Sequence, residues 1–151
     1  MRSNRKLLAA LAALLVASLA PQSAAQTAAG ILLQIEKHAV LTRAGQVRIR
    51  IQITCGPFAG VEEFQDGHAG GGQNKTGASS ETGIDGTVLC DGVTRVHTAH
   101  LSPLDENEFK HGPAGASAVL IVCTLEGEDQ ACFSGSTSRG IIVRGGPQVR
   151  S

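Results

Sequence analysis

A strict alternation of apolar and polar residues from Val47 to Cys55 constrains the fold more than any other part of this sequence. The odd positions carry Val, Ile, Ile, Ile and Cys, whereas the even positions carry Arg, Arg, Gln and Thr. Because successive side chains of a β-strand point to opposite faces, this pattern predicts a strand with one face in a core and the other in water. Cys55 shares the parity of the isoleucines, so its sulfur is expected to point inward.

The rest of the chain also favours strands. No stretch after residue 25 combines sustained helical periodicity with a capping signal, and the 19 glycines fit a turn-rich chain. About seven short strands separated by turn signals predict an all-β fold, an immunoglobulin-like antiparallel β-sandwich. The expected strands are 31–36 with 39–42 as a broken first strand, 47–55, 61–65, 87–90, 94–101, 114–123 and 137–144.

Two segments need a separate interpretation. Residues 67–86 are rich in Gly, Ser and Thr, which predicts either a mobile loop or a frayed edge strand. Residues 114–123 become continuously apolar toward their end, so we expect a central strand that is covered on both faces.

The first 25 residues predict a cleavable secretion signal. Arg2, Arg5 and Lys6 precede an uncharged apolar run from Leu7 to Ala20, and small residues at 23–25 suit a signal peptidase. We expect cleavage after Ala25, with Ala29 as the alternative. The run is shorter than the roughly 20 residues that a membrane span requires, so no stable anchor is expected after cleavage.

The predicted organisation is therefore a signal peptide at 1–25, a flexible start at 26–30, a β-sandwich domain at 31–145 and a disordered tail at 146–151. Removing residues 1–25 leaves ten basic and thirteen acidic residues, a net charge of −3. A mildly acidic domain lacks the positive surface that nucleic acid or an anionic membrane would attract. The expected location is outside the cell.

All four cysteines, Cys55, Cys90, Cys123 and Cys132, lie after the signal, and an even number in an exported chain predicts two disulfides. Three pairings are possible. We favour Cys55 with Cys90 and Cys123 with Cys132, because the second pair flanks the polar segment 124–131 and could clamp a hairpin. Loop-closure entropy gives roughly 4 kcal/mol for the longer loop and roughly 3 kcal/mol for the shorter one. No Cys-x-x-Cys pair or Cys/His cluster suggests zinc.

Three short segments of the sequence together resemble one known group of proteins. The stretch 49–57, the turn Cys90-Asp91-Gly92 and the stretch 109–116 resemble small exported bacterial immunoglobulin-like proteins of unassigned function. This resemblance covers most of 30–145 and implies a fold without implying a ligand.

Two other families are weaker matches. Cys123 and Cys132 are similar to the late bridge of the neocarzinostatin-type apoproteins, which are secreted seven-stranded sandwiches with two disulfides and a ligand cleft. The 34 residues between Cys55 and Cys90 depart from the early bridge of that family. The Cys55-Gly56-Pro57 element after a strand resembles the secreted subtilisin inhibitors, but no reactive-site residue carries over.

The sequence predicts no catalytic residue, no metal ligand and no cofactor. His97 and His100 form the one close histidine pair, but residues three apart on a strand point to opposite faces and could share a metal only in a loop. The acidic residues Glu126, Glu128 and Asp129 could take calcium, but a solvated hairpin tip is the favoured explanation for them.

The chain has no Trp or Tyr and only four Phe, which disfavours a sugar-binding surface built on exposed rings. Of these four, Phe109 and Phe133 are expected in the core. The predicted function is a non-enzymatic binding or structural module whose extracellular ligand or partner protein is unknown. The alternative is a protease inhibitor with a disulfide-held loop at 91–93 or 124–131.

Overall fold

A computed structural model describes residues 30–146 of the chain, and every regular element in this part is a β-strand. The predicted signal peptide, residues 26–29 of the predicted flexible start and residues 147–151 of the predicted tail lie outside the described residues. Between residues 30 and 146 there is no helix that could cross a membrane. The all-β prediction is confirmed.

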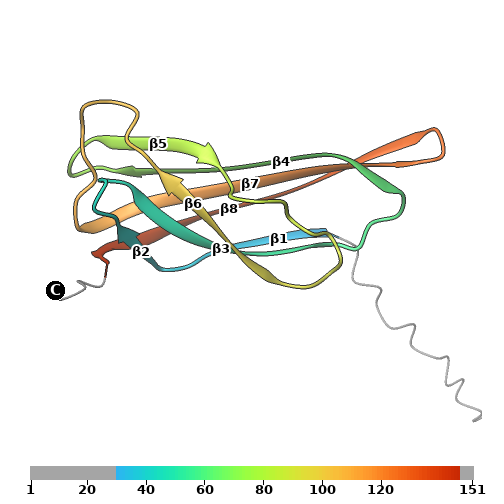
Figure 1. Ribbon diagram of the computed structural model, residues 1–151, viewed down its shortest axis with the longest axis horizontal. Coiled ribbons are helices and arrows are strands. Elements are labelled where there is room, and N and C mark those ends of the chain that lie inside the picture. Colours follow the sequence, from blue (N-terminus) through green and yellow to red (C-terminus); the bar gives the residue numbers. More distant parts are fainter. Residues whose placement is uncertain (1–29, 147–151) are drawn as a thin grey trace, which may run out of the picture.

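Eight strands form one mixed sheet in place of the seven that the sequence predicts (Figure 1). The first begins at Gly30, one residue before the predicted domain start, and pairs there with Gly56. The strands are β1 (Gly30–Ile35), β2 (His38–Leu41), β3 (Val47–Gly56), β4 (Val61–Gln73), β5 (Ala78–Gly83), β6 (Arg95–Leu101), β7 (Gly112–Glu126) and β8 (Asp129–Gly145).

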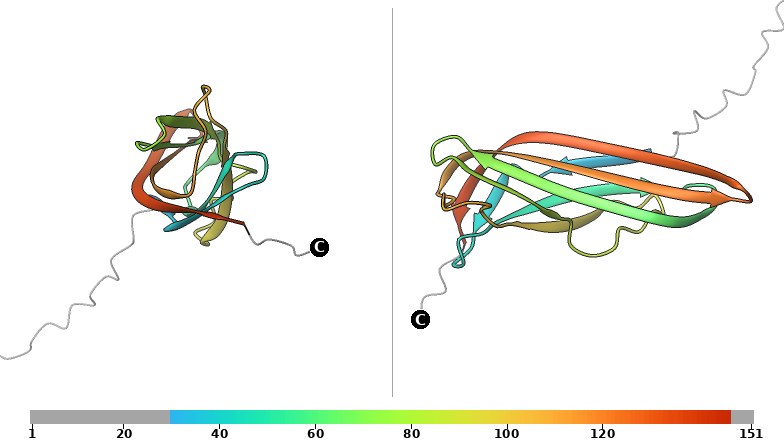
Figure 2. Two further views of the ribbon diagram at one scale, coloured as in Figure 1. Left: turned by 90° about the vertical axis from the view of Figure 1, so that its left-hand side faces the viewer. Right: turned by 90° about the horizontal axis from the view of Figure 1, so that it is seen from above.

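The short strand β2 joins the two halves of the sheet. It pairs antiparallel with β3 and parallel with β8, whereas every other pair is antiparallel. Hydrogen-bonded neighbours follow the order β1-β3-β2-β8-β7-β4-β5, and β6 lies on the other edge of β3. The sheet folds over at β2, so that β1, β3 and β6 face β8, β7, β4 and β5, as the end-on view in Figure 2 shows.

The core lies between these two halves. All five odd-numbered residues from Val47 to Cys55 are buried, which confirms the alternation prediction and the inward direction of Cys55. From the opposite half, β7 contributes Ala116, Ala118, Leu120 and Val122 to the same apolar cluster. Phe109, from the loop before β7, is also buried in it, as the sequence predicts.

The prediction that both faces of β7 are covered is wrong. This strand is central, between β4 and β8, but its burial alternates along its length. Ile121 is 37% exposed and Ser117 is exposed, because no element of the described chain lies over the outer face of β7. The apolar run therefore includes one side that faces solvent.

The Gly-rich segment 67–86 is an ordered edge hairpin for most of its length, and the mobile-loop alternative is wrong. Strand β4 continues to Gln73, and β5 pairs with it from Ala78 to Gly83 at the edge of the sheet. Residues 87–90, which the sequence predicts as a strand, pair with none. Instead, the Gln65 side chain takes the place of a strand, since its amide donates to the Val88 carbonyl and accepts from the Val88 N–H, both at 2.8 Å.

The disulfides join Cys55 to Cys90 and Cys123 to Cys132, the pairs that the sequence favours. Cys123 and Cys132 lie directly opposite each other on β7 and β8. Residues 124–131 are not the loop that the sequence suggests, because β7 continues to Glu126 and β8 begins at Asp129. Gly127, at a φ of 65° that other residues rarely adopt, allows the two-residue turn between them.

Core packing between the halves predicts a sharp contrast between two neighbouring residues of β7. Leu120→Ala should lower the free energy of unfolding by about 2–5 kcal/mol, because it leaves a cavity at a fully buried position. Ile121→Ala, on the exposed face, should cost about 1 kcal/mol or less. Urea denaturation followed by far-UV circular dichroism measures both, and equal losses would contradict the described orientation of β7.

Candidate functional site

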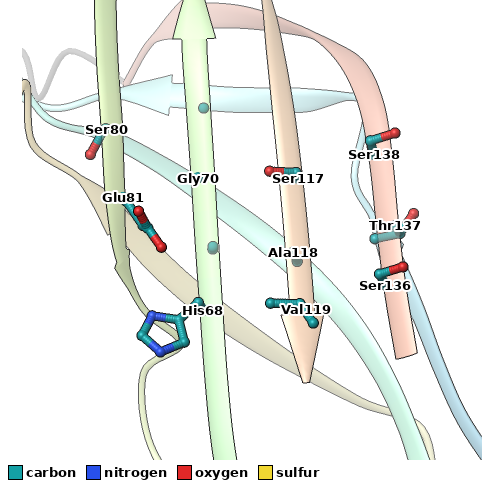
Figure 3. Close-up of a pocket in the computed structure, with 12 residues that line it drawn as sticks. His68, Gly70, Ser80, Glu81, Ser117, Ala118, Val119, Ser136, Thr137 and Ser138 are labelled. Carbon is teal, nitrogen blue, oxygen red and sulfur yellow. The ribbon is translucent and has the colours of Figure 1, made fainter. Parts of the chain in front are cut away.

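The outer face of β5, β4, β7 and β8 carries a shallow, open depression with a volume of about 730 Å³ (Figure 3). A second hollow of about 780 Å³ continues it toward Pro113 and shares Gly71 and Ser117 with the first. Together they extend along β4 and β7 across much of this half of the sheet.

Glycine and serine at outward positions make the surface hollow. Gly70 lies between Glu81 of β5 and Ser117 of β7, and Gly72 lies beside Gly115 in the next outward row. These glycines place no side chain over the sheet, so peptide groups form much of the floor. A Cβ at Gly72 or Gly115 would meet no atom closer than 3.6 Å, so larger side chains could stand at either position.

Small hydroxyl groups and a few charged groups surround this floor. Ser136 and Ser138 of β8 line one side, and Glu81 lies on the other side beside His68 (Figure 3). The His68 Nε2 atom is 2.8 Å from Asp66 Oδ1, and both side chains are about half exposed. The depression therefore offers hydrogen-bond donors and acceptors with the Glu81 carboxylate at its rim, and none of its lining residues is Phe, Tyr or Trp.

His68 and Asp66 are the residue types that activate a serine nucleophile in hydrolases, but Ser136 lies too far from His68 to be activated in this way. In the register of the sheet, His68 is beside Val119, and Ser136 lies one strand further away. Two strand spacings amount to roughly 10 Å, which is too far for a hydrogen bond. Within residues 30–146, no hydrogen bond joins a serine hydroxyl to a histidine.

The histidine pair lies on β6, and its two rings point to opposite faces as the strand geometry requires. Both nevertheless contact Asp85. The Nδ1 atom of His97 is 3.2 Å from the Asp85 carbonyl oxygen, and that of His100 is 3.0 Å from the Asp85 carboxylate. No group of three His, Cys, Asp or Glu residues that could hold a metal occurs in the described part of the chain.

Asp85 anchors the connection before β6. Its N–H donates to the Thr98 carbonyl at 2.8 Å, and its carboxylate accepts from the Thr98 hydroxyl at 2.7 Å. The same carboxylate oxygen contacts His100. These contacts on one strand give the cluster a structural role.

The disulfide-held loop at Cys90–Val93 is exposed and is held by several hydrogen bonds. The Gly92 N–H donates to the Cys55 carbonyl, and the Val93 N–H donates to the Asp91 carboxylate. Arg95 contacts both oxygens of that carboxylate at 2.6 and 2.7 Å. This hydrogen-bonded pair holds the pKa of Asp91 well below its usual range and raises the pKa of Arg95.

Large apolar side chains stand at both ends of this loop. Leu89 is 55% exposed and Val93 is 53% exposed, on either side of Cys90. The second predicted inhibitor segment, 124–131, presents only the turn at 127–128 and two strand ends. Its acidic residues Glu126, Glu128 and Asp129 are all exposed at the hairpin tip.

The phenylalanines divide between core and surface. The prediction that Phe133 lies in the core is wrong, because it is only half-buried and stacks on Phe58 with ring centroids 4.1 Å apart. Its position on β8 lies toward the hairpin tip, beyond the main apolar cluster. Phe64 is exposed on β4.

Comparison with protein-family models, with curated protein sequences and with solved structures found no match.

The residues of the outer depression were not predicted as a site. The signal in the sequence is the spacing of Ser134, Ser136 and Ser138 and of Gly70 and Gly72, since residues two apart on a strand share one face. That spacing could have indicated a face without large side chains. It could not have shown that β4, β7 and β8 are neighbours.

The Asp91–Arg95 pair predicts a pH-dependent effect of one substitution. Asp91→Asn keeps an oxygen for the Val93 N–H and removes the charge. Because the pKa of Asp91 is lowered in the folded protein, the ion pair stabilises the fold above the unfolded pKa of about 3.9 and this contribution is lost as the pH falls. The variant should therefore melt below the wild type at pH 7, and the difference should narrow below about pH 4. Thermal melts across this range test it, and a constant difference would contradict it.

Proposed function

We propose that the chain is exported and that its folded part is an immunoglobulin-like β-sandwich that acts as a non-catalytic extracellular binding module. The amino-terminal pattern and the two disulfides support export. The broken first strand supports the fold assignment, since β1 pairs with one half of the sheet and β2 with both. The facing halves and their shared core also fit a two-layer sandwich.

The outer depression on β5, β4, β7 and β8 is the observation that supports a binding role. Its floor of peptide groups and its serine hydroxyls suit a polar ligand that lies flat and forms several hydrogen bonds. No Phe, Tyr or Trp lines the depression, which disfavours a ligand recognised by stacking on a large ring. We therefore assign the binding role to this face and to an extended polar ligand.

One substitution at the centre of the depression tests this assignment. Ser117 is exposed on the middle strand β7, so Ser117→Arg should fill the hollow without disturbing the core. Immobilised wild-type protein should retain a component of the culture medium, and the variant should retain at least about tenfold less. Mass spectrometry and carbohydrate analysis identify the retained material.

The matched control is Gln34→Arg, which adds the same side chain at an exposed position on β1, in the other half of the sheet. It should retain as much as the wild type. Equal retention by Ser117→Arg and the wild type would exclude the depression as the binding face.

A second candidate function, protease inhibition, is favoured by the loop around Cys90. A disulfide-held segment with exposed apolar residues on both sides has the form of a substrate-like inhibitor loop. The segment 89–93 contains no Lys or Arg, so it suits an enzyme with an apolar primary pocket, such as a subtilisin-like protease, rather than a trypsin-like one.

Inhibition assays against a subtilisin-like protease test this second candidate. Micromolar protein should inhibit the enzyme, and Leu89→Ala should weaken inhibition at least about tenfold by removing the apolar anchor. Val96→Ala, another exposed apolar residue but on the outer face of β6, should inhibit like the wild type. Absence of inhibition by the wild-type protein at this concentration would exclude the function for such enzymes.

A further inference from the structure

Strand β8 leaves most of one edge unpaired. It pairs with β7 from Asp129 to Val143, but with β2 only from Ile142 to Gly145. Along residues 129–140, the edge away from β7 has no backbone partner within residues 30–146. A long edge of this kind presents a row of free N–H and C=O groups to another strand.

The register shows which groups these are. The N–H of Ile142 donates at 2.8 Å to the carbonyl of Lys37, which lies on the β2 side. Because alternate residues of a strand direct their backbone groups to the same side, the N–H and C=O groups of Ser138, Ser136 and Ser134 also point away from β7. The short Cα–Cα distance of 4.0 Å between Cys123 and Cys132 agrees, since it is typical of a pair that is not joined by backbone hydrogen bonds.

The other long edges of the sheet are partly closed by the chain itself. On β5, the Ser79 carbonyl accepts a hydrogen bond from the Leu104 N–H at 3.0 Å. On β6, the Thr98 carbonyl accepts from the Asp85 N–H at 2.8 Å. Strand β1 lies against β8 near Gly135, where an added Cβ would be 2.7 Å from the Ile31 carbonyl oxygen, but no backbone hydrogen bond from the described residues closes the edge of β8 along 129–140.

Strand β8 also lacks the features that usually prevent edge pairing. Natural edges carry proline, lysine, bulges or inward-pointing charges, or they are short. Strand β8 has 17 residues without Pro or Lys, and its pairing with β7 runs without a register shift. The part from Gln130 to Ser138 is uncharged. Of the two charged residues next to this part, Asp129 lies at the hairpin turn, and Arg139 donates to the Ile35 carbonyl at 2.9 Å and is held by β1.

We propose that a second copy of this chain pairs with the free edge of β8, antiparallel and about a two-fold axis at Ser136. A two-fold axis places the same edge on both copies, and it necessarily makes the two β8 strands antiparallel. Ser136 then exchanges backbone hydrogen bonds with Ser136 of the second copy, and Ser134 does so with Ser138. No like charges oppose each other in this register, and small hydroxyl side chains can meet across it.

Such a pair joins the two halves β5-β4-β7-β8 of both copies into one continuous eight-stranded sheet. The depressions of both copies then lie on the same side of that sheet, because the outward serines of β8 share their face. The proposal does not depend on the binding role of the depression.

Ser136→Pro tests the proposal at the centre of the new interface. Proline removes the N–H that points to the free edge, and proline is tolerated on edge strands where that N–H faces solvent. Sedimentation equilibrium of the secreted wild-type protein should show a monomer–dimer equilibrium. The variant should dissociate at a concentration at least about tenfold higher, with a circular dichroism spectrum like that of the wild type.

Ser136→Lys gives a second route, because it places two like charges opposite each other across the axis, and its dimer should weaken most at low salt. The matched control is Ser79→Lys on β5, the opposite edge of the same sheet, which should dimerise as the wild type does.

Amide exchange measured by NMR gives a direct readout, since the N–H groups of Ser136 and Ser138 should become protected as the protein concentration rises. A wild-type protein that remains monomeric at millimolar concentration, or rapid exchange at these amides in a dimer, would overturn the proposal.

Discussion

The apolar contact between the inward face of β3 and that of β7 is the interaction on which the rest of the structure depends. Isoleucines from one half of the sheet meet Ala116, Ala118, Leu120 and Val122 from the other half. Burial of an aliphatic side chain contributes roughly 1.5–3 kcal/mol, so a few such residues outweigh any single polar contact in this protein. The sheet can fold over only because both strands present one apolar side.

The two disulfides differ in their position and in their action, since Cys55 is buried in that core whereas Cys123 and Cys132 lie outside the apolar cluster. Cys55–Cys90 joins residues 35 apart in sequence and holds a segment that has no strand partner of its own. Cys123–Cys132 spans only nine positions and joins two strands that are already paired. The first bond therefore fixes an irregular segment, whereas the second reinforces a hairpin beyond the reach of the apolar cluster.

Much of the local structure could be predicted from the sequence, because local structure follows periodicity and turn chemistry. The alternation at 47–55, the break after β1 and the turn at Asp91-Gly92 all have short-range causes. Two of the predictions that failed concern neighbours distant in sequence. The outer side of β7 is exposed because no element covers it, and residues 87–90 stay out of the sheet because Gln65 holds them.

The candidate site could be predicted only in part for the same reason, because its residues come from strands that are distant in sequence. Individual glycines and serines were visible in the sequence, but the depression exists only where β4, β7 and β8 lie side by side and their small residues share rows. Sequence spacing gives the face of each strand and cannot give the order of strands. By contrast, the disulfide pairing was accessible, since the residues between Cys123 and Cys132 were already recognisable as a hairpin.

The Gln65 side chain, and not a neighbouring strand, pairs with the backbone of Val88, and this affects how the segment 84–94 can move. The segment 84–94 is held at Asp85, at Val88 and at Cys90, by a carboxylate, an amide and a sulfur bridge respectively. Only the last of these is covalent, and the other two contacts break reversibly in water. A reducing medium would remove this covalent link and leave the segment held by its two polar contacts and by the buried Val88 side chain. The redox state of the surroundings therefore sets how many of these constraints act on the segment, while the core continues to hold it through Val88.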